Sequence, residues 1–479
     1  MMKQLIAALG VFLYTAYQAQ PLTTFNRTYN DSLNWSSTGN NVIELNGEFI
    51  TASRGQEGSS NGGYYSMLVK IDPDGELVRR LFTNRSNEQA CKGGIGVEKT
   101  SSNIYTFVGE RIISNPSNLN VNITKFNSNL DTIWNLRSSD SASYNLPLSF
   151  KIVKNFIYVV GMRPIENSNP SKENGFILVA DTSGIQVNFN LFNIDSIDHN
   201  FYSIAKAEAN NLLLGGGRYD SLYHGLVVKT DSIGNMLWHR WYPELWGANI
   251  NSLSDSTYIL TGSTPDGYSG RIAKIDADGD VIWMKTFPFG TELNLYNSIK
   301  TTYGGMVSVG LTTVTTQNGN DAYIQKVDFE GNLLWQRSFN GIGYGVDFFS
   351  NVIETSDGGL LINGSTNEGF AGGQNLWLVK LDSMGCLEPD CWVGVEQADA
   401  NKLGVAVYPN PATDWLYLKY DNTRKITLEI FNLSGQRVLQ HQHIAPKESI
   451  EISHLPSGLY LLRFVDEVGN VAMEKLVVE

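Results

Sequence analysis

The chain has 479 residues and a formal net charge of −13, and only 17% of its residues are charged. A negative balance disfavours binding to nucleic acids and anionic membranes, because their phosphate groups require basic partners. Glycine is abundant, at 46 residues, and aromatic residues reach 11%. This composition is typical of short strands joined by tight turns and predicts an all-β protein of more than one domain.

Residues 1–19 have the pattern of a signal peptide. Lys3 precedes an apolar run, Leu5–Tyr17, that is too short to span a bilayer but suits a signal-peptide core. The small Ala19 predicts cleavage before Gln20. The alternative is a buried N-terminal strand. No later stretch approaches 18 apolar residues, so we expect no transmembrane span.

One phrase recurs seven times, at intervals of 45 to 55 residues: Lys, apolar, Asp, two residues, Gly, then apolar residues and often Trp. Examples are KIDPDGELVR from residue 70 and KVDFEGNLLW from residue 326. The third positions are Asp72, Asn127, Asp181, Asp231, Asp276, Asp328 and Asp382. Asp followed three residues later by Gly favours a type I turn, in which the Asp carboxylate accepts a hydrogen bond from a nearby backbone amide.

Each copy predicts four antiparallel strands. In the best-defined copy these are residues 297–301, 306–312, 322–327 and 332–339. Four strands per unit of about fifty residues describe a propeller blade, so seven copies predict a seven-bladed β-propeller. The phrases resemble those of bacterial repeat propellers, and this resemblance implies the fold but not the function.

The seventh copy lacks its fourth strand, and the N-terminal segment can supply it. TFNRTYN at 24–30 aligns with LWQRSFN at 334–340. We therefore expect residues 21–30 to pair with the strand that ends near Asp382, which closes the ring and protects its edges. The propeller would then occupy residues 20–386.

The fourth strand of several copies carries Trp at the same position, and Arg79 and Asn188 replace it in two others. A repeated Trp can form a ligand platform, but one Trp per blade favours packing between blades. The tryptophans are Trp134, Trp238, Trp283 and Trp335.

Two of the three cysteines, Cys386 and Cys391, enclose four residues that include Pro389. A disulfide between them is plausible in an oxidising compartment, and two reduced thiols are the alternative. Cys91 is left over. No further ligands stand at zinc spacing, so we predict no metal site.

Residues 387–404 form a polar linker, and the repeat pattern ends there. Residues 405–479 predict seven short strands, which suit a small Ig-like β-sandwich. Several motifs occur in order in this segment: YPNP, IFNLSGQRV, LPSGLYLLRF and a terminal KLVV. They contain Tyr408, Pro409, Asn410, Pro411, Gly435, Gly458 and Tyr460.

These motifs closely resemble the type A C-terminal sorting domain of type IX secretion substrates. The resemblance implies that residues 405–479 bind the type IX secretion machinery. It also implies that the protein passes through the periplasm and is secreted or attached to the outer-membrane surface. An ordinary carbohydrate-binding sandwich is the alternative.

The propeller sequence contains no recognisable catalytic or cofactor motif. It has no Walker loop, no HExxH and no G-x-S-x-G nucleophile elbow, in which that motif would join a strand to a helix. Asp276, Asp278 and Asp280 resemble a calcium loop, but Gly279 stands at the wrong position for an EF-hand. We therefore predict no catalytic, cofactor-binding or metal-binding residues.

The sequence favours a non-catalytic binding or adhesion module whose loops bind a glycan or a protein. Long polar connections are expected at residues 115–120, 165–174 and 312–321. The alternative is a secreted polysaccharide hydrolase with carboxylates at the mouth of the propeller channel. A carboxylate pair with one raised pKa would favour the hydrolase, whereas an asparagine-rich, aromatic rim would favour binding.

Overall fold

The computed structural model is built almost entirely of β-strands. It describes residues 23–29, 36–56, 64–83, 91–112, 115–138, 144–165, 172–219, 223–254, 256–302, 304–314, 319–340, 345–367, 374–387, 405–419, 425–432, 437–444, 448–466 and 471–478. The predicted signal peptide with Ala19 and Gln20, most of the linker, Cys391 and Gly435 lie outside the described residues.

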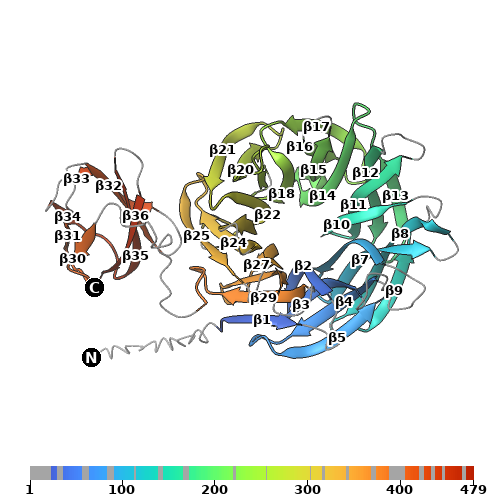
Figure 1. The fold of residues 1–479 in the computed structure, drawn as a ribbon, viewed down its shortest axis with the longest axis horizontal. Coiled ribbons are helices and arrows are strands. Elements are labelled where there is room, and N and C mark those ends of the chain that lie inside the picture. The colour runs from blue at the N-terminus through green and yellow to red at the C-terminus, as the bar shows by residue number, and fades with distance from the viewer. Residues whose placement is uncertain are drawn as a thin grey trace, which may run out of the picture.

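Seven four-stranded sheets surround a central axis and form a seven-bladed β-propeller (Figure 1). Within each sheet, consecutive strands pair antiparallel. The first three blades contain β2 (Ser36–Leu45), β3 (Glu48–Gln56), β4 (Tyr64–Ile71), β5 (Leu77–Thr83); β6 (Cys91–Lys99), β7 (Asn103–Ile112), β8 (Asn115–Asn127), β9 (Thr132–Arg137); and β10 (Leu146–Val153), β11 (Phe156–Ile165), β12 (Lys172–Asp181), β13 (Gln186–Leu191).

The next three blades contain β14 (Asp198–Lys206), β15 (Leu212–Tyr219), β16 (Tyr223–Thr230), β17 (Met236–Tyr242); β18 (Trp246–Ser252), β19 (Thr257–Ser263), β20 (Ser269–Asp276), β21 (Val281–Pro288); and β22 (Glu292–Lys300), β23 (Met306–Thr313), β24 (Gly319–Val327), β25 (Leu333–Phe339). The short β26 (Gly345–Val346) adds to the start of β24. The expected polar connections are shorter than predicted: residues 115–120 begin β8, residues 172–174 belong to β12, and residues 312–313 and 319–321 belong to β23 and β24.

The seventh blade combines strands from both ends of the propeller. It contains β27 (Phe348–Glu354), β28 (Leu360–Thr366) and β29 (Asn375–Leu381), and its outer strand is β1 (Phe25–Tyr29). Phe25 lies opposite Lys380 and Tyr29 opposite Leu376 in an antiparallel register. The N-terminal segment therefore supplies the missing fourth strand, as its alignment with residues 334–340 predicts.

The repeated Asp forms the same turn in every blade that carries it. In the sixth blade, Asp328 Oδ1 accepts the amides of Glu330 at 3.0 Å and Asn332 at 2.7 Å. In the second blade, Asn127 makes the equivalent bonds to residues 129 and 131. The other members with this pattern are Asp72, Asp181, Asp231, Asp276 and Asp382.

The glycine of each Asp turn has a left-handed backbone, with φ between +77° and +97°. Only glycine adopts this conformation without steric cost, which explains the fixed Asp–Gly spacing.

The Trp of the fourth strand packs on the turn of the following blade. A Cβ atom placed on Gly385 would lie 2.6 Å from the Trp335 indole, and the corresponding distances are 3.1 Å for Gly184 and Trp134 and 2.9 Å for Gly279 and Trp238. Trp335 is only 2% exposed. The repeated Trp is therefore a packing residue between blades, as its period predicts.

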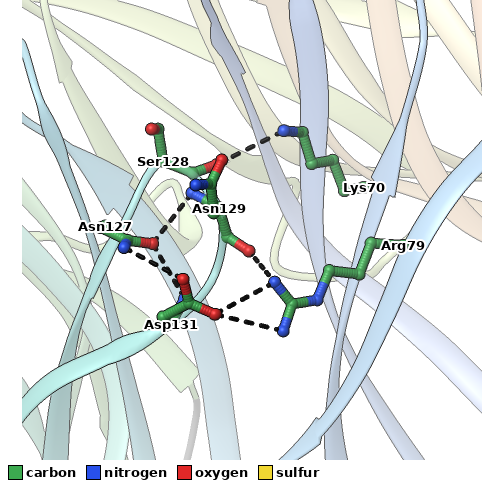
Figure 2. Close-up of polar contacts among 6 residues, drawn as sticks. All are labelled: Lys70, Arg79, Asn127, Ser128, Asn129 and Asp131. Atoms are coloured by element: carbon green, nitrogen blue, oxygen red, sulfur yellow. Dashed lines mark hydrogen bonds and ion pairs between the residues drawn. The ribbon is translucent and has the colours of Figure 1, made fainter.

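A polar contact replaces this packing between the first two blades (Figure 2). Arg79 Nη1 donates to the Asn129 carbonyl and pairs with Asp131 Oδ1 at 3.3 Å. Lys70 Nζ donates to the Ser128 carbonyl at 3.3 Å. The side chain at the position equivalent to Trp, here Arg79, therefore contacts the turn of the next blade even where Trp is absent.

The C-terminal segment contains the seven strands expected from its sequence. They are β30 (Ala406–Tyr408), β31 (Trp415–Lys419), β32 (Ile426–Asn432), β33 (Arg437–Ile444), β34 (Ser449–Glu451), β35 (Gly458–Asp466) and β36 (Val471–Val478). They form two sheets, ordered β30-β31-β34 and β33-β32-β35-β36. Leu416 and Ile450 of the first sheet share one hydrophobic core with Leu462 and Phe464 of the second, in an Ig-like arrangement.

Candidate functional site

Strand direction divides the propeller into two poles. The Asp turns lie at one end of the blades, which we call the turn pole. The connections into the first strand and into the third strand of each blade lie at the opposite end, which we call the loop pole. Residues 191–198, 242–246 and 263–269 are described connections of the loop pole. A binding site is more often found at the end that carries longer connections.

A cavity of about 300 Å³ lies between the innermost strands, and all seven blades contribute residues to it. The first strand of each blade lies nearest the axis in Figure 1. Each of these strands has a register shift, which inserts two extra residues into the ladder in β6 and one in each of the other six strands. The residue that resumes pairing after the shift lines the cavity in every blade: Asn41, Ile95, Ser149, Ser203, Asn249, Asn297 and Asn351.

Some of these side chains bridge neighbouring blades. Asn41 Nδ2 donates to the Val97 carbonyl at 2.8 Å, and Asn41 Oδ1 accepts the Val97 amide at 2.7 Å. Ser203 Oγ accepts the Ile250 amide at 2.9 Å and donates to the Ala248 carbonyl at 3.3 Å. These bonds satisfy backbone groups on strand edges that face the channel and have no strand partner there.

Two other members of this set have side-chain oxygens without a hydrogen-bond partner among the described residues. The Oδ1 atoms of Asn297 and Asn351 are buried and accept no hydrogen bond from any described group of the protein. Buried polar atoms are normally hydrogen-bonded, so these two unpartnered oxygens are exceptions in the cavity wall.

The cavity carries almost no net charge. Among its described lining residues, Glu98 is the only carboxylate and Lys151 the only cationic side chain. Lys151 Nζ lies 2.8 Å from Glu98 Oε1. Attraction by Glu98 raises the pKa of Lys151, although burial acts in the opposite direction. The lining is therefore neutral and rich in amides and hydroxyls, and it contains no pair of carboxylates among the described residues.

A carboxylate pair does occur at the loop pole, between the third and fourth blades. The Glu173 amide donates to Asp198 Oδ1 at 3.3 Å, which places the two residues side by side. Burial, and to a lesser extent the charge of Asp198, raises the pKa of Glu173. Neither residue is among those that line the central cavity.

The residues singled out in the sequence do not converge on the cavity. The six repeat aspartates bind amides of their own turns at the turn pole. Cys386 is buried, and its Sγ accepts a hydrogen bond from Arg337 Nη2 at 3.3 Å. Its predicted partner, Cys391, is outside the described residues. In the part of the chain with described positions, no group of three His, Cys, Asp or Glu side chains could hold a metal ion.

Several sorting-motif residues hold the C-terminal sheets together. Asn410 Nδ2 donates to the Lys475 carbonyl at 2.6 Å, and Asn410 Oδ1 accepts the Val477 amide at 2.9 Å. Tyr460 donates its hydroxyl proton to the Pro456 carbonyl at 2.7 Å. Tyr408, Pro409 and Pro411 lie at or just after β30, and Gly458 begins β35. Asn410 therefore ties the YPNP segment to the last strand.

A family model described as the secretion system C-terminal sorting domain matches residues 406–479. These residues form a type IX secretion C-terminal sorting domain. The sorting domain supports export of the protein by the type IX system to the cell surface or beyond. Over the described residues, the structure has no helix of the length and apolarity required to cross a membrane.

No curated protein matches this chain. Among solved structures, the α-L-arabinofuranosidase Arb93A from Fusarium graminearum is similar, with 9% identity, a TM-score of 0.42 and coverage of 76% of this chain and 98% of that chain. The β-propeller domain of the Trilobed protease from Pyrococcus furiosus has 9% identity, a TM-score of 0.40 and coverage of 72% and 95%. Likenesses at this level say nothing about ligand or activity.

Sequence reasoning missed the cavity residues. A signal for them exists, because Asn or Ser recurs at one position of the first strand in six of the seven blades: Asn41, Ser149, Ser203, Asn249, Asn297 and Asn351. It is weak because both residues are also common in turns.

Proposed function

We propose that this chain is an exported, non-catalytic binding protein whose propeller takes a neutral, hydroxyl-rich ligand such as a glycan. The observation that carries this proposal is the amide-rich cavity, whose single described carboxylate is neutralised by Lys151. Binding sites commonly place a few convergent polar groups in a concave pocket. Asn249, Asn297 and Asn351 supply amide groups of this kind in the cavity wall.

A glycan array, combined with a hydrolysis assay, tests this function on the exported protein. We expect binding of one or more glycans without release of reducing sugar. A double variant, Asn297→Ala with Asn351→Ala, should weaken binding, whereas Asn129→Ala, at the turn pole, should not. Absence of binding to every glycan would contradict the proposal.

A polysaccharide hydrolase is the second candidate, and the Glu173–Asp198 pair favours it. A half-buried carboxyl with a raised pKa beside a second carboxylate is a common arrangement for acid catalysis. Hydrolysis by the natural protein that is lost in Glu173→Gln, while glycan binding persists, would establish this candidate over the first.

Delivery by the sorting domain has its own test. We propose that residues 1–19 direct the chain into the periplasm and that residues 405–479 bind the type IX machinery. Deletion of residues 405–479 should leave the propeller in the periplasm, and surface delivery of that truncation would contradict the proposal. N-terminal sequencing of the exported protein should begin at Gln20.

The proposed disulfide between Cys386 and Cys391 can be tested on the same material. Non-reducing peptide mapping should recover the two cysteines in one linked peptide, and quantitative alkylation of both without reduction would exclude the bond.

A further inference from the structure

Exposed aromatic side chains gather at the loop pole of the fourth and fifth blades. Trp246 begins β18 and is 45% exposed, and Tyr268 in the connection before β20 is 62% exposed. Tyr219 ends β15 and is 58% exposed. Large aromatic surfaces left in water at the end that carries the connections mark an interaction site.

Neighbouring groups hold the Trp246 ring in place. The Tyr223 ring lies 6.0 Å from it, measured between centroids, at an angle of 44°. On the connection before β20, a Cβ atom on Gly267 would lie 3.6 Å from Trp246 Cζ3, so this backbone runs close to the indole. The ring is therefore positioned before any ligand binds, which reduces the entropy lost on binding.

The connection that carries Tyr268 is ordered by its own hydrogen bonds. Asp266 Oδ1 accepts the Tyr268 amide at 3.1 Å and the Thr264 hydroxyl. The Gly267 amide donates to the Thr264 carbonyl at 2.8 Å. This connection is a hydrogen-bonded turn that carries Tyr268, and its Gly267 backbone runs close to the Trp246 indole.

Strand β18 links the aromatic site to the cavity. Trp246 lies at its loop-pole end, and Asn249 and Asn251 further along the strand line the cavity. Trp246 and Asn249 pair with Ser263 and Thr261, which are two residues apart on β19, so Asn249 lies roughly 7 Å from Trp246 along the strand. Tyr202, which also lines the cavity, accepts the Ala248 amide on its hydroxyl at 2.7 Å and so fixes the irregular part of β18.

We propose that Trp246 and Tyr268 bind the apolar face of a sugar ring in a neutral oligosaccharide, and that the chain extends toward Asn249 and Asn251. This inference rests on the proposed binding function and assigns its ligand class and entry point. The C–H face of a pyranose packs on an aromatic ring, and its hydroxyls suit amide side chains. The net charge of −13 disfavours acidic polysaccharides.

The test measures binding of the exported protein to neutral and acidic oligosaccharides by array and then by calorimetry. Trp246→Ala should weaken binding of the neutral ligand about ten- to hundredfold, whereas Trp246→Phe should retain part of the affinity. Trp415→Ala is a matched control, because Trp415 is 46% exposed and lies in the sorting domain. It should leave affinity unchanged, and circular dichroism should show that all three variants fold.

The outcomes separate this inference from the function on which it rests. Neutral-glycan binding that Trp246→Ala leaves intact would overturn the aromatic site while the binding function stands. Binding confined to acidic glycans or to proteins would also overturn it. No binding of any ligand would remove the proposed function itself, and the inference with it.

Discussion

The indole of Trp335 on β25 lies directly against Gly385, in the Asp turn of the next blade. A Cβ atom on Gly385 would be 2.6 Å from Trp335 Cη2, closer than carbon atoms can approach. The same relation joins Phe25 of the N-terminal strand to Gly75 of the first blade, where the distance would be 2.9 Å. The contact between an aromatic ring and the glycine of the next Asp turn therefore recurs around the propeller. It also occurs where the N-terminal strand of the seventh blade meets the first blade.

Gly385→Ala should destabilise the propeller by about 2–4 kcal/mol, because it adds both a steric clash and a strained positive φ. Gly47→Ala is the control: Gly47 has φ +81°, but no atom lies within 4 Å of a Cβ placed there. It should cost only about 1 kcal/mol. Urea unfolding measures both values, and equal losses would show that the Trp335 contact contributes nothing.

Trp335→Ala should lower the free energy of unfolding by about 3–5 kcal/mol, because it leaves a cavity between two blades. Arg79→Ala at the equivalent position should cause little change, because its ion pair with Asp131 is exposed to solvent. Thermal unfolding of the two variants tests this difference. A large effect of Arg79→Ala would contradict the view that blade contacts are stabilised mainly by apolar packing.

Tyr29→Phe tests how firmly the N-terminal strand is held. Tyr29 donates its hydroxyl proton to the Gly75 carbonyl at 2.7 Å, and Tyr242 makes the same bond to Gly279 at 2.7 Å within the continuous part of the ring. Each Phe variant should lose about 1 kcal/mol. If Tyr29→Phe has no effect while Tyr242→Phe does, the strand is not an integral part of the seventh blade.

The Asp181 turn should make stability depend on pH in acid. Hydrogen bonds from the Ser183 hydroxyl and the Ile185 amide lower the pKa of Asp181 in the folded state. Its contribution is therefore present above the unfolded pKa of about 3.9 and is lost as the pH falls through the lower folded value. Asp181→Asn should keep the turn, as Asn127 does, but remove this dependence.

Urea titrations of the natural protein and Asp181→Asn at pH 7, 5 and 3 measure the effect. The stability difference between the two proteins should shrink toward pH 3. A stability difference that is constant or grows in acid would contradict a lowered pKa of Asp181 in the folded protein.

Local rules made several features predictable from the sequence. The Asp turn depends on hydrogen bonds within five residues, so Asp328 and Gly331 determine it wherever they occur at that spacing. The number of blades could be predicted from the number of copies. The N-terminal strand could be predicted because Phe25 is an aromatic residue that aligns with Trp335 of the sixth copy. The sorting domain is recognisable because its motifs occur in order over a short segment.

The cavity depends on the closed ring. Asn41, Asn249 and Asn351 are up to 310 residues apart in the sequence and meet only because seven blades surround one axis. An extra residue in the first strand of each of these three blades sets which face of the strand its side chains occupy, and the sequence does not mark that insertion. The sequence alone determined the repeat and its turns, because these depend on near neighbours. The tertiary structure decided which polar groups face the axis, because that depends on closure and strand register.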